Sequence, residues 1–146
     1  MELFEFYTPH GHMKIVIEEF FPAGAARIRK MVRIMKQDPR NNIPGMIKYL
    51  KKQLLLYKKD LEEHRKTSES EMFRWCHDKN ALEKYIEQRR FPSGDPIKSK
   101  KDLAEMKKRL RRARDHEKGY RQSAKSLERD IKRIEKNLEL LNELEE

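Results

Sequence analysis

The sequence contains little of what stabilises small folds covalently or marks tight turns. Among 146 residues there are one cysteine, one tryptophan, five glycines and six prolines. The lone Cys76 excludes a disulfide within the chain and favours a reducing compartment. We therefore expect a cytoplasmic protein.

Long hydrophobic runs are also missing. No stretch without charge is long enough to cross a membrane as a helix. Near the start, Glu2, Glu5, Glu18 and Glu19 interrupt the apolar residues, which is unlike a secretory signal peptide. We expect neither secretion nor membrane insertion.

The composition restricts the size of any core. Charged residues make up 41% of the chain and hydrophobic residues 36%, which is too little to enclose a large globular core. Hydrophobic side chains must therefore line narrow seams between helices. Acidic residues are fewer than basic ones. The chain has 25 Asp and Glu and 35 Lys and Arg, which gives a formal net charge of +10. This excess favours acidic partners such as nucleic acid or an anionic surface.

Two long segments carry apolar residues at alternating spacings of three and four, which is the heptad pattern of coiled-coil helices. In the last third of the chain, only Glu117 interrupts this pattern. The seam positions there are Leu103, Met106, Leu110, Ala113, Glu117, Tyr120, Ala124, Leu127, Ile131, Ile134, Leu138 and Leu141. The earlier seam comprises Ile43, Ile47, Leu50, Leu54, Tyr57, Leu61, His64, Ser68, Met72, Trp75, Lys79, Leu82 and Ile86. The step from Ser68 to Met72 breaks its alternation and predicts a local unwinding of the supercoil.

The two patterns are separated by a cluster of helix breakers at residues 92–96. We expect helices at about 43–91 and 99–145, the second opened by Ser99 and Asp102 in an arrangement that resembles a capping box. Their similar lengths and short connection predict a long antiparallel coiled-coil helical hairpin. In the expected register Trp75 lies near Ala113.

The first forty residues predict a different structure. Residues 2–21 are rich in aromatic and β-branched side chains around Pro9-His10-Gly11, which favours a β-hairpin. Residues 25–37 place four apolar side chains on one helical face that can cover the hairpin. The predicted fold is mainly α (α+β overall), with a small N-terminal base of β-hairpin plus short helix at 1–42 and the coiled-coil hairpin at 43–146.

The positive charge is concentrated between Arg89 and Arg114, at the tip of the predicted helical hairpin. Eleven bases stand there against three acids, so the local net charge is +8. The bases are Arg89, Arg90, Lys98, Lys100, Lys101, Lys107, Lys108, Arg109, Arg111, Arg112 and Arg114. Such a cluster attracts phosphates. We treat these residues as a candidate binding surface for a DNA or RNA backbone or an acidic protein surface, although charged coiled-coil faces often serve only solubility and interhelical pairing.

No pattern predicts catalysis, a cofactor or a metal site. Cys76 and His77 are adjacent on a predicted helix and point about 100° apart, while His10 and His12 flank a turn. There is no glycine-rich phosphate loop, nucleophile triad or paired carboxylate. We expect no enzyme. Because there is also no base-reading motif, any contact with nucleic acid should be to its backbone.

The sequence therefore favours a non-enzymatic binding protein that presents a basic coiled-coil tip to a phosphate-rich partner. The alternative is a structural or adaptor protein, or an inhibitor, that acts through protein–protein contacts. Those contacts would use the coiled coil and the β-hairpin edge near Leu3 to Tyr7, which could also form a homodimer. Glu117 and Tyr120 are expected opposite the Ser68–Met72 step, as a polar layer that sets the register or as a hinge.

Overall fold

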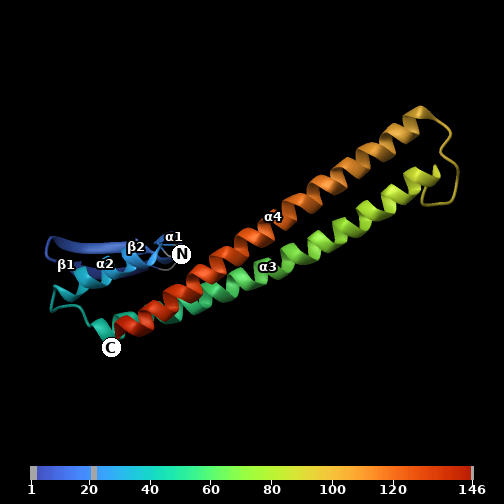
Figure 1. The fold of residues 1–146 in the computed structure, drawn as a ribbon. Helices are drawn as coiled ribbons and strands as arrows, with labels where there is room; N and C mark the ends of the chain where they lie inside the picture. Colours follow the sequence, from blue (N-terminus) through green and yellow to red (C-terminus); the bar gives the residue numbers. More distant parts are fainter. Residues whose placement is uncertain (1–2, 21–22, 146) are drawn as a thin grey trace. The chain divides into compact units, whose positions relative to one another are not determined.

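The computed structural model describes residues 3–20 and 23–145, and it confirms a mainly α fold with a small N-terminal β-hairpin (Figure 1). The elements in chain order are β1 (Leu3–Thr8), β2 (Gly11–Val16), α1 (Ile17–Phe20), α2 (Ala25–Lys36), α3 (Ile43–Gln88) and α4 (Lys100–Glu145). The sequence did not predict the short α1. Glu2 and Phe21, which the predicted hairpin segment included, lie outside the described residues. No described helix is both long and apolar enough to cross a membrane.

The chain packs as two compact units. Unit 1 comprises Met1–Glu63 and Leu127–Glu146, and unit 2 comprises His64–Ser126. Unit 1 therefore holds the β-hairpin, α1, α2, the beginning of α3 and the end of α4. Unit 2 holds the remaining parts of α3 and α4 together with the connection between them.

The predicted β-hairpin is present in unit 1, and its strand β1 alternates between buried and exposed side chains. Strands β1 and β2 are antiparallel, with Phe4 opposite Ile15 and Phe6 opposite Met13. Partners across a ladder share one face of the sheet. Phe4 and Phe6 are buried on that face, whereas Glu5 lies on the other face and is exposed.

Helix α2 and the two long helices complete the core of unit 1. All four apolar residues predicted on one face of α2 are buried, namely Ile28, Met31, Val32 and Met35. They join Phe4 and Phe6 in a cluster that also contains Ile47, Leu50, Leu54 and Leu61 of α3 and Ile131, Ile134, Leu140 and Leu141 of α4. The hairpin is thus covered by helices, which a two-stranded sheet needs for stability in water.

The side chain of Asn41 forms hydrogen bonds with the backbone of β1 at its outer edge. The Tyr7 backbone N–H donates to Asn41 Oδ1 at 2.8 Å, and Asn41 Nδ2 donates to the Tyr7 carbonyl at 2.7 Å. The same amide nitrogen donates to the Met35 carbonyl at 2.8 Å, at the end of α2. Both backbone polar groups of Tyr7 are therefore engaged within the chain, at the edge that a second copy would need for strand pairing.

The long helices pack together in antiparallel orientation. In unit 1, Lys51 Nζ lies 2.6 Å from Glu145 Oε2, and Lys58 Nζ lies 3.2 Å from Glu135 Oε1. Later residues of α3 thus meet earlier residues of α4. All twelve predicted seam positions of α4 are buried or half-buried, which confirms the seam.

One predicted seam position of α3 is wrong. His64 is exposed, and Arg65 is half-buried in its place. The seam therefore steps by four residues twice in succession, from Tyr57 to Leu61 and from Leu61 to Arg65, one turn before the predicted irregularity. The apolar stem of an arginine can lie along a seam while its charged group reaches out, and the Arg65 Nε lies 3.8 Å from Glu69 Oε1. Helix α3 continues unbroken through this region.

Candidate functional site

Unit 2 carries the candidate site, and its shape begins with the end of α3. The Arg89 N–H donates to the Ile86 carbonyl at 3.2 Å, and the Arg90 N–H donates to the Tyr85 carbonyl at 2.9 Å. This pair of bonds is a Schellman motif. Arg89 holds the left-handed position of the motif with φ 55°, a conformation usually taken by glycine. The motif ends α3 at Gln88, three residues before the predicted end.

The connection folds back onto this helix end. The Ile97 N–H donates to the Arg89 carbonyl at 2.7 Å, and Arg90 Nη1 donates to the Gly94 carbonyl at 2.9 Å. Gly94 has a φ of 93°, which a residue with a side chain rarely adopts. Ile97 is buried. The buried Ile97 side chain and these hydrogen bonds therefore hold the connection folded back at the end of α3.

The unusual arginine at the end of α3 gives a first prediction. Arg89→Gly should raise the free energy of unfolding by about 1 kcal/mol, because glycine adopts the left-handed conformation without the steric cost that a side chain adds. Urea unfolding followed by circular dichroism measures the change. Gln88→Gly, one residue earlier in helical conformation, is the control and should lower the free energy of unfolding by about 1 kcal/mol. Destabilisation by both substitutions would contradict the prediction.

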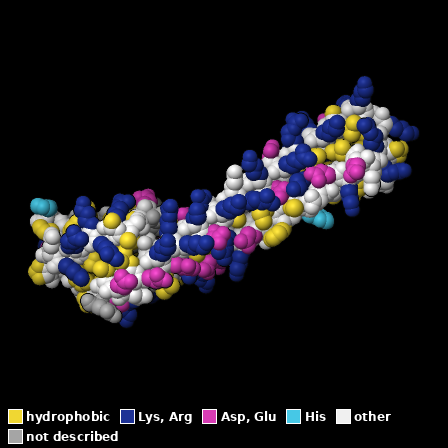
Figure 2. All heavy atoms as spheres, in the orientation of Figure 1, with side chains coloured by type: hydrophobic (Ala, Val, Ile, Leu, Met, Phe, Trp, Pro, Cys, Tyr) yellow, Lys and Arg dark blue, Asp and Glu magenta, His cyan; other side chains and the backbone are white. Residues whose placement is uncertain are grey.

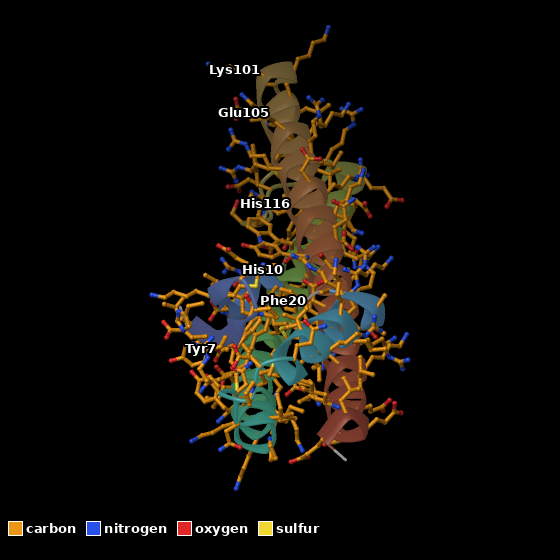
Figure 3. All side chains as sticks on the ribbon, turned by 90° about the vertical axis from the view of Figure 1, so that its left-hand side faces the viewer. Tyr7, His10, Phe20, Lys101, Glu105 and His116 are labelled. Carbon is orange, nitrogen blue, oxygen red and sulfur yellow. The ribbon has the colours of Figure 1, made fainter. Side chains whose placement is uncertain are left out.

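Helix α4 starts where the sequence predicted. Ser99 Oγ accepts the Asp102 N–H at 3.1 Å, and the Ser99 carbonyl accepts the Leu103 N–H at 3.1 Å. Ser99 is therefore the N-cap. Lys101, Glu105 and His116 follow one another along this helix in Figure 3.

All eleven predicted basic residues lie in unit 2 and are exposed. We call them the basic surface. Arg89, Arg90 and Lys98 come from the connection, and the other eight come from α4. Because Met106, Leu110 and Ala113 face the seam and are buried, the charged side chains between them point outward. Figure 2 shows Lys and Arg side chains gathered around the α3–α4 connection.

Seven of the eight charges on α4, all except Arg109, form two rows along the helix. Residues three, four and seven apart share a helix face. Lys101, Lys108 and Arg112 are spaced by seven and four, and Lys100, Lys107, Arg111 and Arg114 are spaced by seven, four and three. Each row thus offers successive positive charges to a linear polyanion.

Carboxylates neutralise very little of the basic surface. Arg114 Nη2 lies 3.1 Å from Glu83 Oε1. Within the described part of the chain, the other ten side chains have no carboxylate within salt-bridge distance, although Arg90 bonds the Gly94 carbonyl. Interhelical pairing therefore does not account for these charges.

A groove of about 520 Å³ lies within unit 2 beside the basic surface. Its lining residues are Trp75, Asp78, Ala81, Leu82, Tyr85, Pro92, Arg109, Arg112, Ala113 and His116. The Trp75 ring stacks on the His116 ring with centroids 4.4 Å apart and 21° between planes. On the face shown in Figure 2, hydrophobic side chains lie among the Lys and Arg side chains near the connection.

The groove combines two residues that the sequence predicted to be neighbours with others that it did not indicate. Trp75 and Ala113 were expected to lie close together, and both line the groove. The aromatic Tyr85 and His116 were not assigned to it. The sequence contained one indication of the groove. The single tryptophan, Trp75, is expected opposite a small residue, Ala113, which leaves space beside the indole ring. Aromatic rings and arginines together can hold planar or anionic groups.

Glu117 is a buried charged residue in the seam of unit 2. Its carboxylate lies 2.8 Å from Lys79 Nζ and 2.7 Å from Arg121 Nη2. The expected position opposite Ser68 is wrong, because Ser68 Oγ lies 3.3 Å from Ser123 Oγ instead. The hydrogen bond from Lys79 lowers the pKa of Glu117 below its ordinary value of 4.5, and Arg121 contributes further. A buried carboxylate needs such partners, so Glu117 joins α3 to α4 in this unit.

This ion pair predicts a dependence of stability on acid. Because the folded-state pKa of Glu117 is lowered, its contribution is complete above the unfolded value of 4.5 and is lost as the pH falls through the folded pKa. Glu117→Gln should lower the free energy of unfolding at neutral pH and reduce its loss on acidification. Urea unfolding between about pH 3 and pH 7 measures both effects.

The control for this prediction is Glu105→Gln, which changes an exposed carboxylate on the same helix. It should leave the pH profile unchanged. Asp38 should still contribute acid sensitivity in the Glu117→Gln variant, because Arg40 lowers the pKa of Asp38 through a side-chain hydrogen bond. An unchanged profile in Glu117→Gln would contradict the assignment.

Similarity to other proteins supplies no function for this site. Comparisons with protein-family models, with curated proteins and with solved structures found no match to the chain. In residues 3–20 and 23–145, no three His, Cys, Asp or Glu side chains are placed to hold a metal ion together. Cys76 is a half-buried free thiol. The chemistry of the site therefore has to be inferred from its charges and its groove.

Proposed function

We propose that the protein is a non-enzymatic nucleic-acid-binding protein whose basic surface contacts the phosphate backbone. The observation that carries this proposal is that ten of the eleven exposed bases have no carboxylate partner among the described residues. When unpaired Lys and Arg side chains neutralise phosphates, they release the cations condensed on the nucleic acid, which favours binding. The rows of charge on α4 suit a linear series of phosphates.

The proposed contacts do not read base sequence. Phosphate contacts fix position and orientation but carry no direct sequence information. The basic surface presents long flexible side chains on the outer faces of one helix and a short connection, which suits backbone contact with DNA or RNA. With a single cysteine in the chain, the proposal places the protein in the reducing cytoplasm.

A salt titration tests the proposal. Fluorescence anisotropy with labelled single-stranded and duplex DNA and RNA should show binding that weakens linearly in log–log form as salt increases, with a slope of about −0.9 for each duplex phosphate contacted. The emission of Trp75, the only tryptophan, provides a second signal because this residue lies in the groove beside the basic surface. Absence of binding at low salt to all four probes would reject the proposal.

Exposed apolar residues support a second candidate function, that of an adaptor binding other proteins. In unit 1, Tyr49 and Leu55 line a depression of about 740 Å³ together with three lysines. Leu55 and Leu56 are 55% and 52% exposed, and Phe73 in unit 2 is 67% exposed. Apolar side chains grouped on a surface often mark protein contacts. Light scattering over a range of concentrations tests self-association, and a constant monomer mass would exclude a homodimer.

A further inference from the structure

The groove in unit 2 is formed mainly by one face of α3 and one face of α4. Four lining residues of α3 share a face because they follow one another at spacings of three and four, namely Trp75, Asp78, Leu82 and Tyr85. The lining residues of α4 also share a face, and they are Arg109, Arg112, Ala113 and His116. The volume of about 520 Å³ lies within the range of about 300–1,000 Å³ that is common for small-molecule sites.

The aromatic rings of the groove offer a flat surface to a ligand. The Trp75 ring has two neighbours, because the His116 ring stacks on it at 4.4 Å and the Arg74 guanidinium lies 5.7 Å from its centroid. His116 is exposed, and no second aromatic ring of the described residues stacks on it. The imidazole face turned away from Trp75 is therefore open to another planar group.

The charged residues of the groove suit a nucleotide better than a simple anion. Arg109 and Arg112 line the groove, and neither has a carboxylate partner among the described residues, so both can bind phosphate. Asp78 also lines the groove and is half-buried. Its carboxylate repels a phosphate, but it can accept a hydrogen bond from the amino group of a base, as carboxylates do from N4 of cytosine. A base beside Asp78, with its phosphates at the arginines, satisfies both kinds of charge.

The two arginines connect the groove to the basic surface, of which they are members. Arg112 precedes His116 by four residues and Arg109 precedes it by seven, so they lie about 6 Å and about 10 Å from it along the helix axis, on the same face. A strand whose phosphates contact these arginines brings its bases beside His116. The base must be unpaired, because a base in a duplex is already stacked and paired, and extracting it is costly.

We propose that this groove holds one unpaired base of a single-stranded nucleic acid, stacked on His116, while Arg109 and Arg112 contact the neighbouring phosphates. The inference rests on the proposed function, because the phosphates of the same strand occupy the basic surface. Every base has a flat π-face, so stacking of this kind adds affinity without demanding one sequence. A strand that carries bases should therefore bind more tightly than a bare backbone of equal charge.

Fluorescence anisotropy with two labelled single strands and the full chain tests this difference. One strand contains ten deoxycytidines, and the other has the same sugar–phosphate backbone with an abasic site at every position. The strands carry equal numbers of phosphates, so contacts to the backbone alone would give equal affinities. With a base in the groove, the cytidine strand should bind at least about fivefold more tightly at the same salt concentration.

Histidine variants separate stacking from charge. His116→Ala should bring the two affinities close together and leave that for the abasic strand unchanged, because no phosphate contact is removed. His116→Phe keeps a flat ring and should retain the preference for the cytidine strand. The control is His77→Ala, which makes the same change at an exposed residue of α3 that does not line the groove. It should leave both affinities as they are in the unchanged protein.

Nuclear magnetic resonance detects the stacking itself. The ring current of a base stacked on the imidazole should move the ring-proton signals of His116 upfield as the cytidine strand saturates the protein, whereas the abasic strand should not. The signals that His116→Ala removes identify this residue among the five histidines.

The outcomes distinguish this inference from the proposed function. Equal binding of both strands would overturn the inference and leave the phosphate contacts standing. A preference for the cytidine strand that survives in His116→Ala, or the lack of an upfield shift, would also overturn it. If neither strand binds at low salt, the proposed function fails, and the inference fails with it.

Discussion

Reversal of four charges on α4 should abolish nucleic-acid binding at physiological salt. Changing Lys108, Arg109, Arg111 and Arg112 to Glu would replace exposed bases that have no carboxylate partner among the described residues. Removing four phosphate contacts should flatten the log–log salt dependence by about three to four, and added carboxylates would repel the backbone. The affinity should fall by more than about a hundredfold. Fluorescence anisotropy at several salt concentrations measures the affinity and the slope.

The control must change the net charge equally at other exposed positions. Reversing Lys48, Lys59, Lys66 and Lys125 also lowers the formal charge from +10 to +2. If the basic surface is the contact site, this control should weaken binding only modestly and should keep most of the salt slope. Equal losses in both variants would show that net charge alone attracts nucleic acid. In that case the rows on α4 would have no specific role.

Periodicity in the sequence was sufficient to predict which helix faces are buried. The α4 seam from Leu103 to Leu141 is covered as expected, because each apolar residue at spacing three or four gains from burial only on that face. The breakers at 92–96 and the Ser99 cap gave the position of the connection. Local chemistry thus determines where these helices begin and end.

Periodicity cannot specify how far one helix slides along the other. The apolar pattern is nearly the same after a shift of one turn, so the polar seam residues decide the register. Here Glu117 pairs with Lys79, and Ser68 pairs with Ser123. The sequence contained all four residues, but it offered no way to choose among their possible partners.

The sequence predicted where positive charge is concentrated, but it did not predict the groove or the cavities that the folded chain forms. The eleven bases are visible in the sequence as a local excess of positive charge. The groove beside Trp75 depends on which small residue faces the ring, and a cavity of unit 1 near Gly24 brings together residues more than one hundred positions apart. Such cavities arise from long-range packing, which local patterns do not encode.

Truncation of a core leucine should produce the largest loss of stability. Leu50 is fully buried in the unit 1 core. Leu50→Ala should therefore lower the free energy of unfolding by about 2–5 kcal/mol, through lost apolar burial and the cavity that remains. Leu55→Ala makes the same chemical change just over one turn later on α3, where the side chain is 55% exposed. It should alter the free energy by no more than about 0.5 kcal/mol.

Urea unfolding measures both variants, with the denaturant slope checked for constancy. The comparison also bears on the adaptor function, because it reports whether Leu55 is covered in solution. If Leu55→Ala destabilises the protein nearly as much as Leu50→Ala, the exposed leucine must be buried against another molecule. Its effect would then depend on protein concentration, since association stabilises the folded state by mass action. A small effect at every concentration would leave Leu55 open to solvent in the isolated protein and would assign the stability of unit 1 to its own core.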